Sequence, residues 1–388
     1  DLDKIRIQKT AKQFCEKVPK GGMLHVHPFG TLDRPTAESL LQTLNPALQF
    51  TDILKDIDES NGNVTLYPHE RSWLNQVTVN SNYLSLSAPD QKKFESFLFL
   101  PPGKQPFSRF NGVFKFLGFA IPDWASYDKV LLSYAQKAVN EGVIYVEFTT
   151  GTGADLFTHL ATLEKQTGLV IRTNNSFNRT KDLATIDQSL SEFLAAPSSP
   201  YLVGIDFLDN EETNQALEKG QLLYGAVLQG NISGKIKLHR TMHAGEIGDI
   251  RNPRDAMIMG VERLGHGVNL AKDPVALEYA ALIHEPIEVN LSSNLRLTDV
   301  ANIYEHPFLN YLRLGLPVSL STDDEVIFEI DINHECELAI DQTDMSYAEL
   351  KQMAFNSIQT SFASEADKKT LLDKLTNKFE EFEKNKAR

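Results

Sequence analysis

The decapeptide from Lys237 to Glu246, KLHRTMHAGE, places a histidine and a carboxylate on either side of a small-residue turn. His243 can bind a metal ion through a neutral ring nitrogen. Gly245 has no Cβ, so the chain can turn sharply there and bring Glu246 back toward His243. A metal ligand and a general acid or base would then lie in one loop. Taken alone, the decapeptide fits equally well a strand that ends in a turn.

Two more histidines, His25 and His27, lie in a run that reads Met-Leu-His-Val-His and is followed by Pro28 and Gly30. We predict a strand here, ended by the proline and glycine. Side chains alternate along a strand, so residues two apart point the same way. The two imidazoles of such a His-x-His pair can bind the same metal ion. The alternative is two polar residues on a solvated face.

Two later stretches add His266, between two glycines, and the pair Asp323-Asp324. Alone, the first fits a simple turn, and the second is more typical of the N-cap of a helix that starts near Glu325. Three histidines and one aspartate form a suitable set for Zn²⁺, with room for a water molecule. Glu246, His266 and one of the two aspartates would then remain for proton transfer.

The elements that must position these residues follow a regular pattern. Runs with β character, mostly alternating with helical segments, are expected at residues 23–27, 143–148, 169–172, 201–206, the start of the decapeptide, 262–266, 286–290 and 317–321. This alternation predicts an α/β fold, a closed parallel (β/α)₈ TIM barrel. An open doubly wound sheet is the alternative, but neither GxGxxG nor a P-loop is present. Catalytic side chains of such barrels lie at the carboxyl ends of the strands, where all four stretches fall.

The rest of the chain is expected to support this barrel as one domain over residues 1–388. Residues 1–20 read as one amphipathic helix, and the part from Met345 onward as helical. The segment at about 45–105 is long for a βα connection and is predicted to be an insertion or lid. We expect His239 to have a packing role. Four other histidines are expected to be structural or exposed: His159, His284, His306 and His334.

Composition limits the possible partners. The 388 residues carry a net charge of −14, which argues against nucleic acid or an anionic membrane as the main partner. The sequence contains no run of about 18 apolar residues, so no membrane span is predicted. Cys15 and Cys336 are far apart and indicate neither a CxxC site nor a disulfide framework. A cytoplasmic protein fits this usage slightly better, and an exported protein fits it too.

At these residues the chain resembles the adenosine deaminase family. The matching stretches are PKGGMLHVH at 19–27, HRTMHAGE at 239–246, ERLGHG at 262–267 and PVSLSTDD at 317–324. Together the four motifs are highly specific. The Pro-Lys-Gly-Gly opening and the Ser293-Asn294 pair look closest to the growth-factor-type branch, whose members are often secreted.

The resemblance implies hydrolytic deamination of adenosine or a related 6-aminopurine nucleoside in a (β/α)₈ barrel with one zinc per chain. By motif, four residues look like the zinc ligands: His25, His27, His243 and Asp323. Glu246 looks like the group that protonates the purine ring. His266 and Asp324 look like the residues that orient and deprotonate the attacking water. The same chemistry on a 5′-modified adenosine, a nucleotide or adenine is the alternative, as is a catalytically silent nucleoside-binding or signalling protein. The resemblance leaves the oligomeric state open.

Three positions depart from the family pattern. Phe29 replaces a carboxylate expected near the ribose, next to Gly30, and Asp209 stands where a glycine usually approaches the purine. Glu325 replaces a proline after the aspartate pair. The first two positions concern the substrate, so they weaken the expectation of unmodified adenosine and leave the metal and proton-transfer residues untouched.

Overall fold

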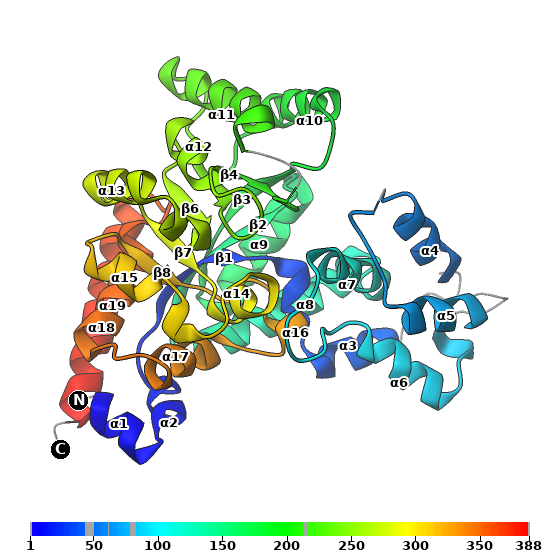
Figure 1. The fold of residues 1–388 in the computed structure, drawn as a ribbon, viewed down its shortest axis with the longest axis horizontal. Helices are drawn as coiled ribbons and strands as arrows, with labels where there is room; N and C mark the ends of the chain where they lie inside the picture. Colours follow the sequence, from blue (N-terminus) through cyan, green and yellow to red (C-terminus); the bar gives the residue numbers. More distant parts are fainter. Residues whose placement is uncertain (1, 43–49, 61, 78–82, 213–215, 387–388) are drawn as a thin grey trace. The chain divides into compact units, whose positions relative to one another are not determined.

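The computed structural model describes residues 2–42, 50–60, 62–77, 83–212 and 216–386. Eight parallel strands form one sheet in the order of the sequence (Figure 1). They are β1 Gly21–Val26, β2 Val143–Thr150, β3 Val170–Asn178, β4 Leu202–Leu208, β5 His239–Ala244, β6 Arg263–His266, β7 Ile287–Val289 and β8 Val318–Leu320. The sheet returns to its start, because Val26 and Asp323 form a parallel bridge and the Asp323 N–H donates to the His25 carbonyl at 3.1 Å. The predicted TIM barrel is confirmed.

The strands have the sequence character of a sheet covered on both faces. β2 reads VIYVEFTT and is buried along all but its last residue, as expected for a parallel sheet with helices packed on it. Each run predicted to be a strand overlaps one of the eight observed strands. The barrel was predictable because its strands alternate with helices along the sequence, and some of these helices begin at a capping side chain. Asp182, for example, accepts from the Thr185 N–H at the start of α10.

The chain forms two compact units. The first, called the barrel unit, comprises Asp1–Val26, Ala135–Asp323 and Asp331–Arg388. Besides the strands it contains α1 Leu2–Gln8, α2 Ala11–Cys15, α9 Ala154–Thr167, α10 Leu183–Ala195, α11 Ala216–Ile232, α12 Asn252–Ile258, η3 Val268–Lys272, α13 Pro274–Ile283, α14 Leu291–Leu297, η4 Ile303–Glu305, α15 Phe308–Arg313, α17 Ile332–Asp341, α18 Tyr347–Gln359 and α19 Glu365–Lys386. α18 packs on β1 and β8, where the barrel closes.

The second unit, called the helical unit, comprises His27–Tyr134 and Asp324–Ile330. It contains η1 Pro28–Thr31, α3 Arg34–Leu41, α4 Phe50–Asp58, α5 Pro68–Val77, η2 Tyr83–Ser85, α6 Ala88–Ser96, α7 Phe107–Ala120 and α16 Glu325–Phe328, and α8 Trp124–Asn140 begins in it. Its core is aromatic: Phe50 stacks on Phe119 at 5.3 Å and contacts Phe94 at 5.4 Å between ring centroids. The predicted lid at 45–105 lies within this unit and stays a prediction; its residues 45–49, 61 and 78–82 lie outside the described part.

The N-terminal prediction of one helix is wrong. Lys9 adopts a left-handed conformation (φ 52°) between α1 and α2 and breaks the helix. Gly21 and Gly22, which follow the predicted helix, belong to β1. Gly21 has φ 79°, and a Cβ there would lie 2.3 Å from the Ala354 carbonyl oxygen of α18. The glycine therefore allows β1 to start against that helix.

The cysteine prediction is also wrong, because Cys15 of α2 and Cys336 of α17 form a disulfide across 321 residues of sequence. Such a pair leaves no spacing pattern that sequence reasoning can detect. Structural disulfides are typical of proteins that fold in oxidising compartments. In the described part of the chain, no helix is long and apolar enough to cross a bilayer.

We predict that the disulfide stabilises the barrel unit. Both cysteines are fully buried, and a crosslink restricts the unfolded chain. The double variant Cys15→Ala/Cys336→Ala should therefore lose roughly 2–4 kcal/mol of unfolding free energy in a denaturant titration. As a control, a reductant should lower the stability of the wild type to the value of the variant and leave the variant unchanged. Equal stability of the oxidised wild type and the variant would contradict this.

Candidate metal centre

A buried group of side chains lies where four strands of the barrel unit end. His25, His243, His266 and Asp323 each offer a ligand atom, and these atoms all lie within 4.8 Å of one another. They come from β1, β5, β6 and the residue that bridges β8 back to β1. All four side chains are buried. Four of the residues predicted to do chemistry are thus brought together, and imidazole with carboxylate is a donor set that suits a divalent metal.

The backbone at these strand ends adopts an unusual conformation. His266 has φ 62° and Asp323 has φ 61°, and both lie in the left-handed region that non-glycine residues rarely adopt. Each such residue costs on the order of 1–3 kcal/mol and persists only where its surroundings enforce it. Gly245, after β5, has φ 88°, as the sharp turn inferred from the sequence requires. Strain of this kind concentrates at functional sites.

A carboxylate contacts the Nδ1 atom of two of the histidines. His25 Nδ1 lies 2.8 Å from Glu288 Oε2, and His243 Nδ1 lies 2.8 Å from Asp206 Oδ2. Glu288 accepts the Nδ1–H of His25, whereas Asp206 lies close to His243 Nδ1 without hydrogen-bond geometry. In both cases the negative charge favours a proton on Nδ1, so the Nε2 atom of each ring keeps its lone pair. His25 Nε2 lies 3.6 Å from Asp323 Oδ1. This arrangement is the one that metal-binding histidines commonly use.

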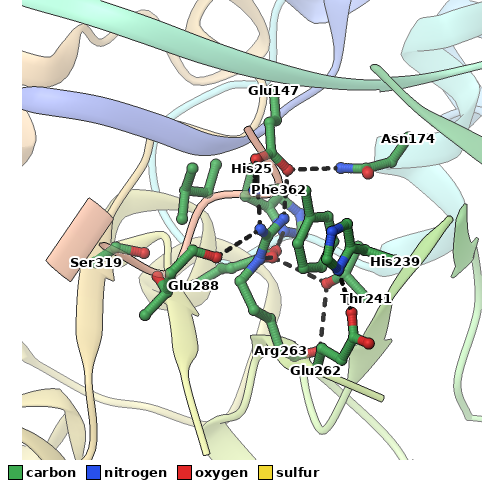
Figure 2. A network of polar contacts seen from close by, with 12 residues as sticks. His25, Glu147, Asn174, His239, Thr241, Glu262, Arg263, Glu288, Ser319 and Phe362 are labelled. Atoms are coloured by element: carbon green, nitrogen blue, oxygen red, sulfur yellow. Dashed lines mark hydrogen bonds and ion pairs between the residues drawn. The ribbon is translucent and has the colours of Figure 1, made fainter. Parts of the chain in front are cut away.

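A network of buried ions positions Glu288 (Figure 2). The Arg263 guanidinium donates from Nε to Glu288 Oε1 and from Nη2 to Glu147 Oε2, both at 2.6 Å. Thr241 Oγ1 donates to the same Glu288 oxygen at 2.9 Å. Burial alone would raise the pKa of the Glu288 carboxyl, but Arg263 and His25 outweigh it and hold that pKa below its usual range. Glu288 is therefore a charged acceptor for the His25 ring.

Glu246 is positioned by its backbone. The N–H groups of Gly245 and Glu246 donate to the two carboxylate oxygens of Glu211 at 2.8 and 3.0 Å. These bonds fix the turn, and Glu246 Oε2 lies 3.8 Å from His266 Nε2. A Cβ on Gly245 would come within 2.5 Å of Pro253 Cγ, so the turn tolerates only glycine. The carboxyl of Glu246 is thus buried beside the histidine group.

Four other predicted residues belong to the helical unit: His27, Phe29, Gly30 and Asp324. His27 lies one residue past β1, and it and Asp324 offer ligand atoms within 4.8 Å of each other. Asp324 occupies the N-cap position of α16, but its side chain makes no capping bond to the described N–H groups of that helix. A Cβ on Gly30 would lie 1.8 Å from Asp324 Oδ1. Phe29 stacks on Tyr127, with 4.9 Å between ring centroids.

Asp209 follows β4 in the barrel unit and has φ 84°. A conformation that favours glycine is consistent with the alignment that places a family glycine here. Its Oδ2 accepts from Asn178 Nδ2 at 2.6 Å, and its Oδ1 accepts from the Asn210 N–H at 2.7 Å. The side chain is thus held against β3 and the following residue.

Sequence reasoning missed the carboxylates that hold the histidines. Asp206 and Glu288 lie inside β4 and β7, between apolar neighbours. A charged residue inside an otherwise apolar strand was the available signal, since buried charges need partners. His239, in contrast, fulfils its expected packing role: it stacks on Phe362 at 4.5 Å and its Nδ1 lies 2.6 Å from Glu262 Oε2.

Comparison with known proteins gives the geometry a family context. The adenosine deaminase of Photorhabdus laumondii subsp. laumondii is 35% identical to this chain over 141 residues. That of Serratia proteamaculans is 36% identical to this chain over 139 residues. Each match covers 36% of this chain and 42% of the relative, so the chain spans less than half the length of these curated relatives.

Two solved structures share the fold. The adenine deaminase of Arthrobacter aurescens has a TM-score of 0.70 at 23% identity and covers 93% of this chain and 99% of its own. An amidohydrolase from Burkhoderia ambifaria, solved with bound Zn, has a TM-score of 0.71 at 18% identity and covers 97% of this chain and 95% of its own. Residues 127–378 match the family model described as adenosine deaminase, and the chain belongs to that family.

Proposed function

We propose that this chain is a zinc-dependent hydrolase that converts adenosine, or a related 6-aminopurine nucleoside, to the inosine-type product and ammonia. The observation that carries the proposal is the buried group of His25, His243, His266 and Asp323 with Glu246 beside it. Membership of the adenosine deaminase family supports the same reaction.

By the family motif, the proposed ligands of one zinc ion per chain are His25, His27, His243 and Asp323. Imidazole and carboxylate are its usual ligands besides thiolate, and a structural neighbour contains Zn. We compare the described buried charges that belong to the ligand group or bond to it and its partners. Carboxyls outnumber guanidinium groups among them: Glu147, Asp206, Glu211, Glu246, Glu288 and Asp323 against Arg179 and Arg263. A buried excess of acids favours a bound cation. When bound, zinc supplies Lewis acidity that makes water a competent nucleophile near neutral pH.

The chain's own residues supply the proton transfers. Glu246, held by Glu211 at the strand ends, gives its proton to the purine ring nitrogen next to C6 and makes that carbon electrophilic. His266 and Asp324 orient and deprotonate the attacking water. Loss of absorbance by adenosine, with and without a chelator, tests this function directly. Absence of turnover on every 6-aminopurine tried would instead support a binding or signalling protein.

The departures from the family pattern favour substrates with an apolar 5′ group. Phe29 presents an aromatic ring, stacked on Tyr127, where the family resemblance leads us to expect a carboxylate. Asp209 places an acid where the family resemblance leads us to expect a glycine, and an acid disfavours an anionic phosphate. Two solved neighbours are described as an adenine deaminase and an Arabidopsis N6-mAMP deaminase, so adenine and nucleotides are the alternative substrates.

The first prediction concerns metal affinity. Replacing Glu288 by Gln removes the charged acceptor of the His25 Nδ1–H and should weaken zinc binding about 10- to 100-fold in a chelator competition. The matched control is Glu262→Gln, which removes a similar contact to His239 outside the ligand group and should leave affinity unchanged. Wild-type affinity in a folded Glu288→Gln protein would argue against the assigned role of His25.

The second prediction concerns the general acid. Gln is nearly isosteric with Glu but has no carboxylic proton, so Glu246→Gln should keep zinc and lose turnover by on the order of 10²-fold or more. Glu285→Gln, at another buried carboxyl of the barrel unit, serves as the control and should retain normal turnover. Near-normal kcat in metal-loaded Glu246→Gln would place the acid elsewhere.

The third prediction concerns substrate range. A 5′-hydroxyl against Phe29 loses a hydrogen bond, which costs roughly 0.5–1.5 kcal/mol, or about tenfold. We expect kcat/KM for 5′-deoxyadenosine and 5′-methylthioadenosine to equal or exceed that for adenosine, and adenosine monophosphate to be poor. Phe29→Asp should shift the preference toward adenosine. A clear preference of the wild type for the monophosphate would overturn this specificity.

A further inference from the structure

A chain of buried hydrogen bonds connects the backbone after η4 to His266. The Phe308 N–H donates to His306 Nδ1 at 3.2 Å, and His306 Nε2 lies 3.0 Å from Asn294 Oδ1. Asn294 Nδ2 lies 2.9 Å from His266 Nδ1, and Asn290 Nδ2 lies 3.4 Å from the same atom. All five residues are buried in the barrel unit, so water does not compete for these bonds.

The direction of every bond in this chain follows from its first donor. A backbone N–H can only donate, so His306 Nδ1 accepts and carries no proton. Burial lowers the pKa of His306 to about 3, so the ring is neutral and its one proton lies on Nε2. The Asn294 atom facing that proton must be the oxygen, which leaves the amide nitrogen to donate to His266. His266 Nδ1 is therefore an acceptor, and the neutral ring carries its proton on Nε2.

This polarity is the reverse of that at the other two histidines of the group. Carboxylates face Nδ1 of His25 and of His243 and draw the proton to that nitrogen. Amide donors face Nδ1 of His266 and exclude a proton from it. A metal needs a nitrogen lone pair, which the first two rings present at Nε2 and which His266 does not.

We propose that His306 is a positioning residue that, through Asn294, holds His266 in the tautomer with its proton on Nε2. His266 then acts as a hydrogen-bond donor beside Glu246, where its Nε2 lies 3.8 Å from Oε2, and not as a metal ligand or as a base at that nitrogen. Of the two residues assigned above to the attacking water, His266 is then left to orient it and Asp324 to take its proton. The catalytic consequence rests on the proposed function, whereas the tautomer itself does not.

The tautomer can be measured without substrate. In protein labelled with ¹⁵N-histidine, the ring nitrogen shifts of His266, identified by their loss in His266→Asn, should show a protonated Nε2 and a bare Nδ1, with and without added zinc. His25 and His243 should show the opposite pattern. A proton on His266 Nδ1 in the wild type overturns the proposal. This readout stands even if no 6-aminopurine is deaminated, in which case the proposed function alone fails.

Variants of His306 test whether it controls this tautomer. His306→Met removes the donor at similar size, so His266 should populate both tautomers and kcat should fall about 10- to 100-fold with zinc content and KM unchanged. His306→Gln retains an N–H donor and should recover most of the loss. His334→Met, at an exposed histidine of α17, is the control. A Gln variant as impaired as the Met variant, or an unchanged tautomer in the Met variant, contradicts the relay.

Discussion

One guanidinium group, that of Arg263, lies between two buried carboxyls at the base of the candidate metal centre, and the ligand geometry depends on it. It bonds Glu147 of β2 and Glu288 of β7, and the Phe362 ring covers it at 3.5 Å. Loss of one partner from a buried pair typically costs about 3–5 kcal/mol, because the remaining charge is left uncompensated. Glu288 also orients His25. The interaction that holds these strands together is thus the one that aims a metal ligand.

The closure of the barrel between β8 and β1 determines where Asp323 lies relative to His25. The bond from the Asp323 N–H to the His25 carbonyl joins the last strand to the first, and it places two candidate ligands on adjacent backbones. Asp323 is held there in a left-handed conformation, which persists only because neighbouring structure enforces it. The donor atoms are therefore positioned mainly by the backbone, which favours a preorganised centre over one that assembles around the ion.

The sequence predicted the barrel and the strand ends that carry His25, His243, His266 and Asp323, because strand periodicity and polar strand ends are local signals. It did not predict the Cys15–Cys336 disulfide, which joins residues 321 apart. Nor did it predict that Asp206 and Glu288 hold two of the histidines, since strand pairing brings them together and no spacing records it. The break at Lys9 was missed because a positive φ at lysine has no sequence signature.

Residue type alone cannot separate the roles of the three buried histidines, because each of them could offer a lone pair or a proton. What separates them is the partner of Nδ1: a carboxylate at His25 and His243, and amide groups at His266. The partner of His266 is in turn fixed by His306, 40 positions along the chain and buried. Since a hydrogen bond to one ring nitrogen decides what the other can do, the division between metal binding and proton donation is set by residues that belong to neither task.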